Sequence, residues 1–507
     1  MEKVGTKVDT KVDSKDEITP VHSPMDSFSD KLDKNSVDLE TKNLSEFLSN
    51  KHPAHPQNWP AWKRWSVLIF YSAMQAFVLW TSSAYGSLSS AVSEYFHVST
   101  QVSMLNMSMN ILGCGLGPIF LGPLSDIGGR KPVYLVSMVI YILFNISCAI
   151  PKNISQMIIS HFIIGVAGST ALTNVAGSVA DMFSEDGSGM GMGMFTWACS
   201  VSAVGSPIGA ALYENPHMGW RWLYWLNMMV GGLFLLGLLF TPETLPTLII
   251  RKYELAQGHS VEFIPKLTTK DAVRNIRFVV TMGFRIMLTE PVVIALGWYN
   301  AFAYGVGYFF LNAIWPVFAG VYKMSAMAAS CTYLSNIVAC LIIYLYQPIQ
   351  EYIYQLDRKK HGGVGRPEAR FKSAVWISLL FPAGMFLFAF TCSGGHPWIV
   401  PIIGMCMQAI PNSHNWLCCL TYLTDAYPVV AASAVAAYTL PSYAGATAFA
   451  HISIVMFDKL SPKWAVAILA FVSLLIPVLI LCIYLFGKRL RDRSKLTGDK
   501  AIRYLPH

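Results

Sequence analysis

Unbroken apolar stretches recur along this chain from residue 65 to residue 486, each roughly 20 residues long, which is the length of a membrane-spanning helix. A soluble helix would keep a charged face, and a strand of a membrane barrel would alternate over about ten residues. Only 13% of the 507 residues are charged, so water is not the main solvent of this chain. The pattern predicts an all-α integral membrane protein that lies in a lipid bilayer.

Twelve such stretches divide the chain into two similar halves. We expect spans at 65–87, 104–124, 132–151, 156–178, 190–213, 223–242, 291–312, 325–346, 373–392, 398–423, 429–452 and 464–486. They predict six-helix halves at 63–243 and 291–487, joined by a cytoplasmic linker loop at 244–290. A disordered N-terminal tail is expected at 1–62, where Lys, Asp, Ser and Thr predominate, and a basic tail at 488–507.

The lysines and arginines favour one orientation of these spans. Of the 37 in the chain, those on the side opposite the termini are only Lys152, Arg221, Lys323, Lys459 and Lys463. Basic loops stay in the cytoplasm, so both termini are expected there. The net charge of +8 is spread over many loops, and we expect no nucleic-acid partner.

The sequence contains no pattern of catalytic or metal-binding residues. The ten cysteines lie mostly inside spans without ligand-like spacing, which predicts neither a disulfide framework nor a metal site. Paired carboxylates, histidine clusters and a nucleophile with its partners are missing from the loops. We therefore expect no enzyme, no metal and no organic cofactor.

The connection after the second span reads Gly-Pro-Leu-Ser-Asp-Ile-Gly-Gly-Arg-Lys from Gly122 to Lys131. It resembles the signature G-x-L-[AS]-D-R-x-G-R-K of the major facilitator superfamily, with Ile127 in place of the usual first Arg. The resemblance implies a gating motif formed by Gly122, Asp126, Gly129, Arg130 and Lys131. It also implies that Asp126 faces the start of the eleventh span and that Arg130 pairs with Asp181. The alternative is an ordinary basic turn.

Further strings resemble the twelve-span fungal drug:proton antiporter family of this superfamily, which carries drugs, polyamines or vitamins. They are His55-Pro-Gln-Asn-Trp-Pro, Gly219-Trp-Arg-Trp, Pro242-Glu-Thr, Thr289-Glu-Pro, Pro367-Glu-Ala-Arg and Tyr422-Leu-Thr-Asp-Ala-Tyr-Pro. The resemblance covers residues 53 to 490 and implies a monomeric secondary transporter. Such a protein uses a proton gradient to move a small organic substrate. The plasma membrane is the family's usual place, with the vacuolar membrane as the alternative.

A motif in the fifth span resembles the family's antiporter motif G-P-x-x-G-G. It contains Gly205, Pro207 and Gly209, with the proline one place late and Ala210 for the last glycine. Small residues allow close helix approach and proline leaves a bend, so this helix could repack during transport. Ordinary tight packing is an equally good interpretation.

Three residues are candidates for proton coupling. The family's fourth span usually carries an Arg in R-x-x-Q-G, and this chain has His161 there. A histidine titrates near physiological pH and could take the proton itself, or it could be a neutral, hydrogen-bonded core residue. Asp181 and Glu290 lie at span edges, where a carboxylate is a functional candidate because an unpaired charge in hydrocarbon is costly.

The seventh span has the clearest binding face. Asn300, Tyr304 and Tyr308 are spaced at i, i+4 and i+8, so they line one side of a helix. Other candidates for substrate binding are Gln75, Trp80, Tyr333, Asn336, Gln408, Asn412 and Asn415. Amide and aromatic groups suit an amphipathic or weakly cationic molecule, whereas a polyamine would require buried carboxylates.

Three functions follow from these expectations. The first is proton-coupled efflux, by antiport, of small drug-like compounds. The second is proton-coupled uptake of a vitamin-like nutrient, or polyamine transport, because fold and motifs permit both directions. The third, from another class, is a nutrient sensor that does not transport.

Overall fold

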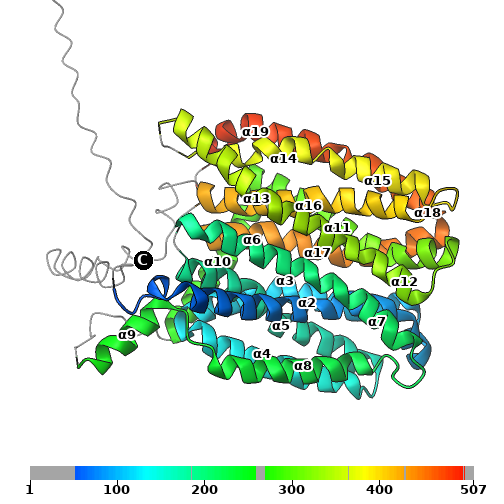
Figure 1. Ribbon diagram of the computed structural model, residues 1–507, viewed down its shortest axis with the longest axis horizontal. Helices are drawn as coiled ribbons and strands as arrows, with labels where there is room; N and C mark the ends of the chain where they lie inside the picture. Colours follow the sequence, from blue (N-terminus) through cyan, green and yellow to red (C-terminus); the bar gives the residue numbers. More distant parts are fainter. Residues whose placement is uncertain are drawn as a thin grey trace, which may run out of the picture.

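The structure is a computed structural model that describes residues 52–183, 185–258, 269–362, 365–427, 430–494 and 496. Within these ranges every regular element is a helix, as expected. The long helices run side by side and form two bundles, the lower one blue to green and the upper one light green to red (Figure 1).

The lower bundle is built from the helices of the first half. These are α2 (Ala61–Phe96), α3 (Thr100–Gly128), α4 (Arg130–Ala149), α5 (Ile154–Met182), α6 (Glu185–Val201), η3 (Ser202–Val204), α7 (Gly205–Glu214) and α8 (Trp222–Phe240). The short η3 joins α6 to α7, so these three elements together make the fifth span.

The upper bundle is built from the helices of the second half. These are α11 (Pro291–Ile314), η4 (Trp315–Val321), α12 (Ala326–Cys331), η5 (Thr332–Leu334), α13 (Ser335–Lys360), η6 (Pro367–Arg370), α14 (Phe371–Ile377), α15 (Leu380–Thr391), α16 (Ile399–Ala426), α17 (Ala431–Lys459), α18 (Pro462–Ser473) and α19 (Leu475–Arg493). Short helices join end to end here as well, so four of the six spans consist of two or more elements.

The helix ends follow from local chemistry. The Oγ of Ser99 accepts from the backbone N–H of Val102, and the Oδ1 of Asn153 accepts from that of Gln156 at 2.8 Å. Both side chains satisfy donors that a helix start leaves free. Between α3 and α4, Gly129 has a φ of 97°, which a glycine adopts without steric cost, so the chain reverses there.

Eleven of the expected twelve spans are long and apolar enough to cross a membrane within the described residues. The remaining one, expected at 398–423, is α16, a helix of 28 residues that packs against α13 and α15. Its middle carries the polar residues Gln408, Asn412, Ser413, His414 and Asn415, which lower its hydropathy. We count it as the twelfth span because it lies among the others and has their length.

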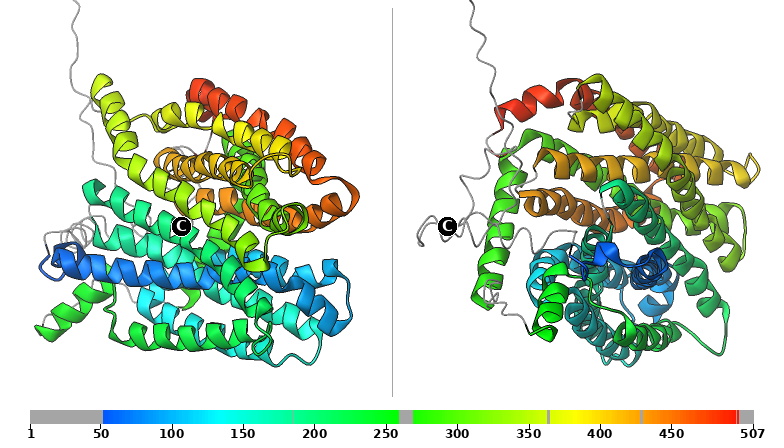
Figure 2. Two further views of the ribbon diagram at one scale, coloured as in Figure 1. Left: turned by 45° about the vertical axis from the view of Figure 1, so that its right-hand side comes forward. Right: turned by 60° about the vertical axis from the view of Figure 1, so that its left-hand side comes forward.

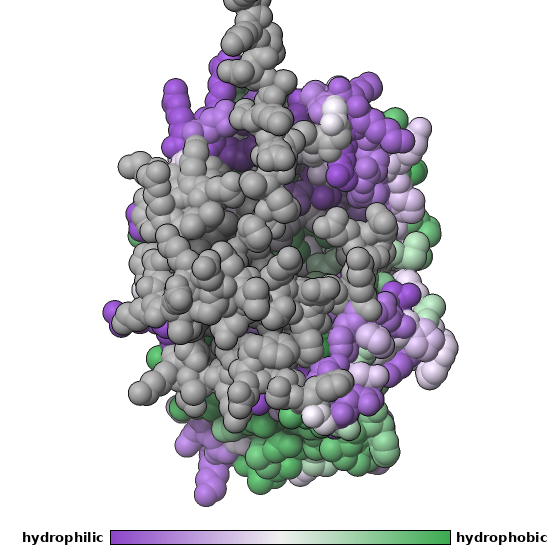
Figure 3. Space-filling model, turned by 90° about the vertical axis from the view of Figure 1, so that its left-hand side faces the viewer, coloured by the Kyte–Doolittle hydropathy of each residue, from purple (hydrophilic) through white to green (hydrophobic). Residues whose placement is uncertain are grey.

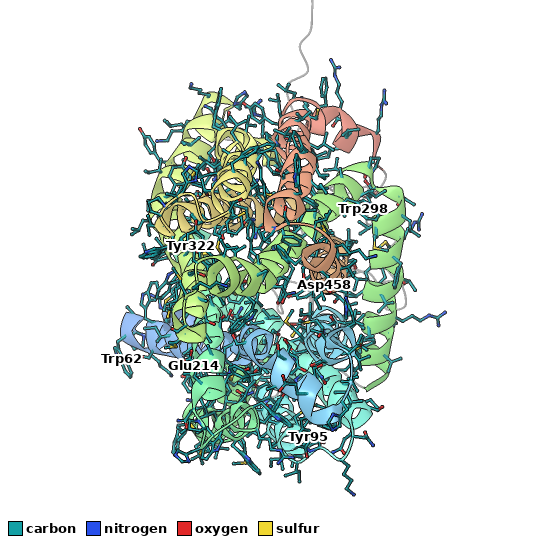
Figure 4. The ribbon with its side chains drawn as sticks, turned by 90° about the vertical axis from the view of Figure 1, so that its right-hand side faces the viewer. Trp62, Tyr95, Glu214, Trp298, Tyr322 and Asp458 are labelled. Atoms are coloured by element: carbon teal, nitrogen blue, oxygen red, sulfur yellow. The ribbon has the colours of Figure 1, made fainter. Side chains whose placement is uncertain are left out.

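We call the end of the bundles that carries Gly129 and the start of α2 the basic end, and the opposite end the far end. Figure 3 looks onto the basic end, where hydrophilic residues gather along the upper rim and hydrophobic ones cover the lower flank. The far end is seen in Figure 4, with Tyr95 on the lower bundle and Tyr322 and Asp458 on the upper one.

The last part of the expected tail is ordered. Residues 1–51 lie outside the described residues, but His55 is buried, and Gln57 donates to the backbone oxygen of Phe183 at 3.4 Å. The Nδ1 of His55 accepts from the N–H of Gln57 and so begins η2 (Pro56–Asn58). Burial lowers the pKa of His55 below 6.5, and the nearby His52 lowers it further.

The expected linker loop contains two helices. They are α9 (Pro246–Ala256) and α10 (Thr269–Thr289), separated by residues outside the described ranges. Helix α10 stands crosswise to the spans at the basic end, upright in the right-hand panel of Figure 2. It packs against α3 of the lower bundle and α17 of the upper one. At the other boundary, α19 continues to Arg493, into the expected basic tail.

Candidate functional site

Four tyrosines gather where the upper bundle meets the lower one. The ring centroid of Tyr304 lies 5.5 Å from that of Tyr308 and 5.6 Å from that of Tyr443 on α17, both edge to face. Tyr333 lies near Tyr304 and Tyr308. Tyr443 packs directly on α3, because a Cβ at Gly115 would lie 2.6 Å from the Cβ of Tyr443. We call these four residues the tyrosine cluster.

The lower bundle adds neutral groups to the same place. Cys114 of α3 and Cys199 of α6 lie within electrostatic range of Tyr304 and Tyr443. The Nε2 of Gln75 lies 2.6 Å from the Sγ of Cys199, and its Oε1 has no partner among the described residues. The predicted ligands Gln75, Tyr304, Tyr308 and Tyr333 are therefore brought together. Phenols, thiols and an amide suit a neutral aromatic molecule with hydroxyl groups.

Trp80 lies elsewhere. Its Nε1 donates to the Oδ1 of Asn227 on α8 at 2.8 Å, inside the lower bundle. The amide of Asn227 donates in turn to Thr81 at 3.1 Å and to Asn145 at 2.9 Å. These contacts give Trp80 a role in packing, and a substrate role for it stays a prediction.

The remaining predicted ligands make contacts within the upper bundle. Asn300 donates to the Oγ of Ser442 and so ties α11 to α17, and Asn336 donates to the backbone oxygen of Tyr333 at 3.1 Å. On α16, Gln408 is buried with no partner for its Nε2 among the described residues, Asn412 is half-buried, and Asn415 lies beside Tyr299. Within the described ranges no hydrogen bond or ring contact joins the α16 residues to the tyrosine cluster.

His161 lies at the centre of the lower bundle with 1% of its surface exposed. Its Nδ1 lies 2.9 Å from the backbone oxygen of Met157, and its Nε2 lies 3.1 Å from the Oη of Tyr224. A neutral ring satisfies both contacts, with Nδ1–H donating to the carbonyl and Nε2 accepting from the phenol. The geometry favours the structural interpretation over proton coupling.

The motif at Gly122 to Lys131 forms a charged cluster at the basic end. The guanidinium of Arg130 lies 2.5 Å from Asp126 and 3.3 Å from Asp181, and it also donates to Ser125 at 2.8 Å. The expected pairing with Asp181 is therefore present. Asp126 has 60% of its side chain exposed and pairs with Arg130 of its own bundle.

Glu243, in the Pro-Glu-Thr string after α8, lies beside this cluster and caps the start of α4. Its carboxylate accepts from the backbone N–H groups of Arg130 at 2.9 Å and Lys131 at 3.1 Å, which are the first free donors of α4. Negative charge is favoured at a helix N-terminus, so Glu243 fixes α4 to α8. The side chain of Lys131 returns to α8 by donating to the oxygen of Leu239 at 2.8 Å.

The upper bundle repeats this plan at the same end. Arg370, just before α14, pairs with Asp425 at the end of α16 at 2.6 Å, as Arg130 pairs with Asp181 at the end of α5. Arg491 of the last span pairs with Glu368 at 3.1 Å. Ion pairs between side chains therefore connect corresponding helices in each half at the basic end.

Glu290 begins α11 and is buried with 5% exposure. It accepts from the Oη of Tyr427 at 3.0 Å and from the Oγ of Ser494 at 2.8 Å. The carboxylate therefore links the start of α11 to the ends of α16 and α19. Its titration during a transport cycle, like that of Asp181, stays a prediction.

Gly205 and Gly209 of the predicted helix-bend motif face α2. A Cβ at these positions would collide with the backbone oxygens of Trp80 and Ala84, respectively. The 3-10 turn of η3 directly precedes Gly205, and Pro207 follows in the first turn of α7, so the hydrogen-bond pattern of the span changes here. A bend during transport stays a prediction. In the upper bundle Gly445 of α17 meets the oxygen of Ala301 on α11 in the same way.

Tyr443 and Glu243 were absent from our candidates. Tyr443 follows Pro441 and Ser442 in a helix that is apolar or small on every side, so spacing alone gave no sign of its direction. Glu243 lies in the Pro-Glu-Thr string, which on its own indicates only the family resemblance. A carboxylate directly after a span, on the same side as the Arg130 turn, was the signal that could have identified it.

Known proteins resemble this chain over most of its length. The family model described as Major Facilitator Superfamily matches residues 67–355. The vitamin B6 transporter bsu1 of Schizosaccharomyces pombe is 56% identical over 486 residues, covering 96% of this chain and 92% of that protein. The multidrug transporter FLR2 of Candida glabrata is 28% identical, covering 90% and 79%. The solved structure of the proton:xylose symporter XylE with 6-bromo-6-deoxy-D-glucose has a TM-score of 0.60 at 14% identity, covering 85% and 96%.

Proposed function

We propose, on the premise that this chain belongs to the Major Facilitator Superfamily, that it takes up vitamin B6-type pyridines together with protons. The Gly122 to Lys131 signature predicted this superfamily and its fold of twelve helices in two halves. The family match and the structural similarity to XylE confirm that prediction. The chain is a multi-pass secondary transporter, and its superfamily and fold are not those of enzymes in general. We further propose that it acts as a monomer in the plasma membrane, with both termini in the cytoplasm.

The tyrosine cluster is the observation that carries the substrate proposal. Vitamin B6 compounds are small pyridines with hydroxyl and hydroxymethyl groups, which stack on aromatic rings and form neutral hydrogen bonds. Tyr304 and Tyr443 offer ring edges and faces, and Gln75 offers a free acceptor beside them. The 56% identity to a vitamin B6 transporter over nearly the whole chain supports the same substrate class.

The second candidate function is efflux of drug-like compounds, our first expectation from the sequence. The similarity to a multidrug transporter supports it, at 28% identity. The vitamin B6 transporter is twice as similar to this chain, at 56% identity. We therefore rank uptake of a small pyridine first.

The test is accumulation of labelled pyridoxine in right-side-out membrane vesicles from a host without pyridoxine uptake. With acid outside, we expect saturable accumulation that a protonophore abolishes. Loss of an aromatic pair costs about 0.5 to 1.5 kcal/mol, so Tyr304→Ala should raise KM roughly 2- to 12-fold, and Tyr304→Phe less. The control is Trp298→Ala on the same helix, where the side chain is 73% exposed and labelled in Figure 4.

Two results would contradict the proposal. Expulsion of pyridoxine when acid is outside would reverse the direction of transport. Extrusion of drug-like dyes by vesicles that ignore pyridoxine would establish the second candidate instead.

A further inference from the structure

Hydrogen bonds that join the two bundles gather toward the far end. The Oγ of Ser87 lies 3.5 Å from that of Ser330, and the carboxylate of Glu214 accepts from the N–H of Met327 at 3.1 Å. On the other side of the bundles, His451 of α17 contacts Gln101 and Ser108 of α3. Figure 4 shows Glu214 on the left at about mid-height, where the bundles meet. In this structure the far end is closed.

The contacts of His451 fix the position of one ring hydrogen. The Nε2 of Gln101 donates to the backbone oxygen of His451 at 3.2 Å, so the Oε1 of Gln101 is the atom that faces the ring. This oxygen lies 2.7 Å from Nδ1, and an amide oxygen only accepts, so Nδ1 carries a hydrogen. The second ring nitrogen, Nε2, lies 2.8 Å from the Oγ of Ser108.

These contacts hold for a neutral and for a charged ring. When the ring is neutral, Ser108 donates its hydroxyl hydrogen to Nε2. When a proton binds to the lone pair of Nε2, that nitrogen donates to the hydroxyl oxygen of Ser108, whose own hydrogen can turn to the carbonyl of Met104, four residues earlier in α3. The site can therefore gain or lose a proton without leaving a polar group unsatisfied.

His161 differs in each of these respects. Its Nε2 faces the phenol of Tyr224, and it is enclosed within a single bundle. A proton on that nitrogen would require the phenol to turn its hydrogen away, and no second acceptor is seen for it among the described residues. His451 is half-buried and lies on a surface that must part during alternating access.

The surroundings of His451 are neutral. Facing it from α3 are Gln101 and Ser108, and α11 contributes Asn312, whose amide donates to Ser453 and to the backbone oxygen of Ala450, the residue before His451. The charged or titratable groups closest along the chain are Asp458 and Lys459, about two turns further along α17, with Glu94 and His97 before α3 and Lys463 at the start of α18. None of them contacts the ring in the part of the chain that the structure describes. A proton on His451 would therefore place a charge among neutral groups at the contact between α3 and α17.

We propose that His451 binds the proton that couples transport. When the far end opens, α3 separates from α17, water reaches the ring, and the ring exchanges protons near its ordinary pKa of about 6.5. When the far end closes, Gln101 and Ser108 hold the ring between the bundles, and the proton leaves Nε2 by way of the Ser108 hydroxyl to water that enters from the opened basic end. This inference rests on the proposed function, since it names the group that carries the proposed proton.

The test separates exchange from accumulation in the vesicles described above. Exchange of labelled for unlabelled pyridoxine needs no proton gradient, whereas net accumulation does. We expect His451→Gln, which keeps neutral hydrogen bonding, to exchange within about twofold of the natural protein but to accumulate no more than without a gradient. Its control is His396→Gln, an exposed histidine at the same end, which should leave both rates unchanged. His161→Gln should keep its dependence on the gradient.

Each result has a separate meaning. If the natural protein ignores the gradient or pyridoxine, the proposed function itself is wrong. If that protein accumulates pyridoxine and His451→Gln does so equally, the inference about His451 is overturned. It is also overturned if His451→Gln loses exchange together with accumulation, which is a structural effect, or if His161→Gln alone loses gradient dependence.

Discussion

At the scale of single residues, the direction in which an aromatic side chain points decides whether it can contact a substrate. The i, i+4 spacing of Tyr304 and Tyr308 correctly placed their side chains on one face. Trp80 was as aromatic and as central in its span, yet it turns to Asn227. Residues 81 to 89 of α2 are all buried and carry small polar residues on several sides, so no single polar face indicates which side meets the other bundle. The direction of such a side chain depends on a neighbouring helix that is distant in the sequence, as α8 is from Trp80.

The buried His55 predicts that the stability of its segment depends on pH. The pKa of His55 is lowered on folding, so the unfolded segment binds protons more readily and stability is lost as the pH falls below about 6.5. Protonation of Nδ1 also removes the acceptor for the N–H of Gln57. We expect the exchange protection of the Gln57 amide to fall with acidification, by about tenfold per pH unit at most.

Hydrogen exchange measured by mass spectrometry from pH 8 to 5 tests this expectation. The matched variant is His55→Asn, whose amide oxygen can cap the same turn but does not titrate. Its protection should stay constant over the range. Equal slopes for the two proteins would show that His55 does not control this segment.

At the scale of helices, the sequence predicted where spans occur better than how they are divided. Length and hydropathy identified the segments, because lipid imposes them on every helix. The 3-10 turn η3 lies directly before the motif at Gly205 and Pro207 for which a bend was predicted, whereas no motif indicated the break at η5. The lower bundle places Gly205 against Trp80, and the upper bundle places Gly445 against Ala301. The linker helices were missed because α10 is charged on one side and packs its other side on α3 and α17.

This packing predicts a difference between two glycines. Replacing Gly205 with Ala adds a methyl group against the oxygen of Trp80, which should destabilise the protein by roughly 1 to 3 kcal/mol. Gly232 on α8 has nothing within 4 Å of the added Cβ, so Gly232→Ala should be neutral or slightly stabilising. Thermal unfolding of the purified proteins in one detergent measures both. A lower melting temperature for Gly232→Ala than for Gly205→Ala would refute the packing argument.

At the scale of the whole molecule, the two halves repeat the same arrangement of charged residues. Ion pairs at the basic end occur in both bundles, Arg130 with Asp181 and Arg370 with Asp425. The first pairing was predicted only from a family resemblance, and the second was not predicted. Pairs so distant along the chain become visible only when the halves are folded and compared.

The orientation of the molecule is itself testable. Cysteines placed at Lys152 and Lys323 should react with a membrane-impermeant maleimide added to intact cells. Cysteines at Lys252 and Lys359 should react only after permeabilisation. The background protein should lack Cys482, the one native cysteine that is exposed among the described residues. The reverse pattern of labelling would place the termini outside.

The polar centre of α16 has a consequence for biosynthesis. A helix with Gln408, His414 and Asn415 in its middle partitions weakly into lipid as an isolated segment, because each polar group opposes insertion. Its neighbour α15 is strongly apolar and meets it closely where Gly384 and Gly404 approach. We expect α16 to leave the translocon only as a hairpin with α15.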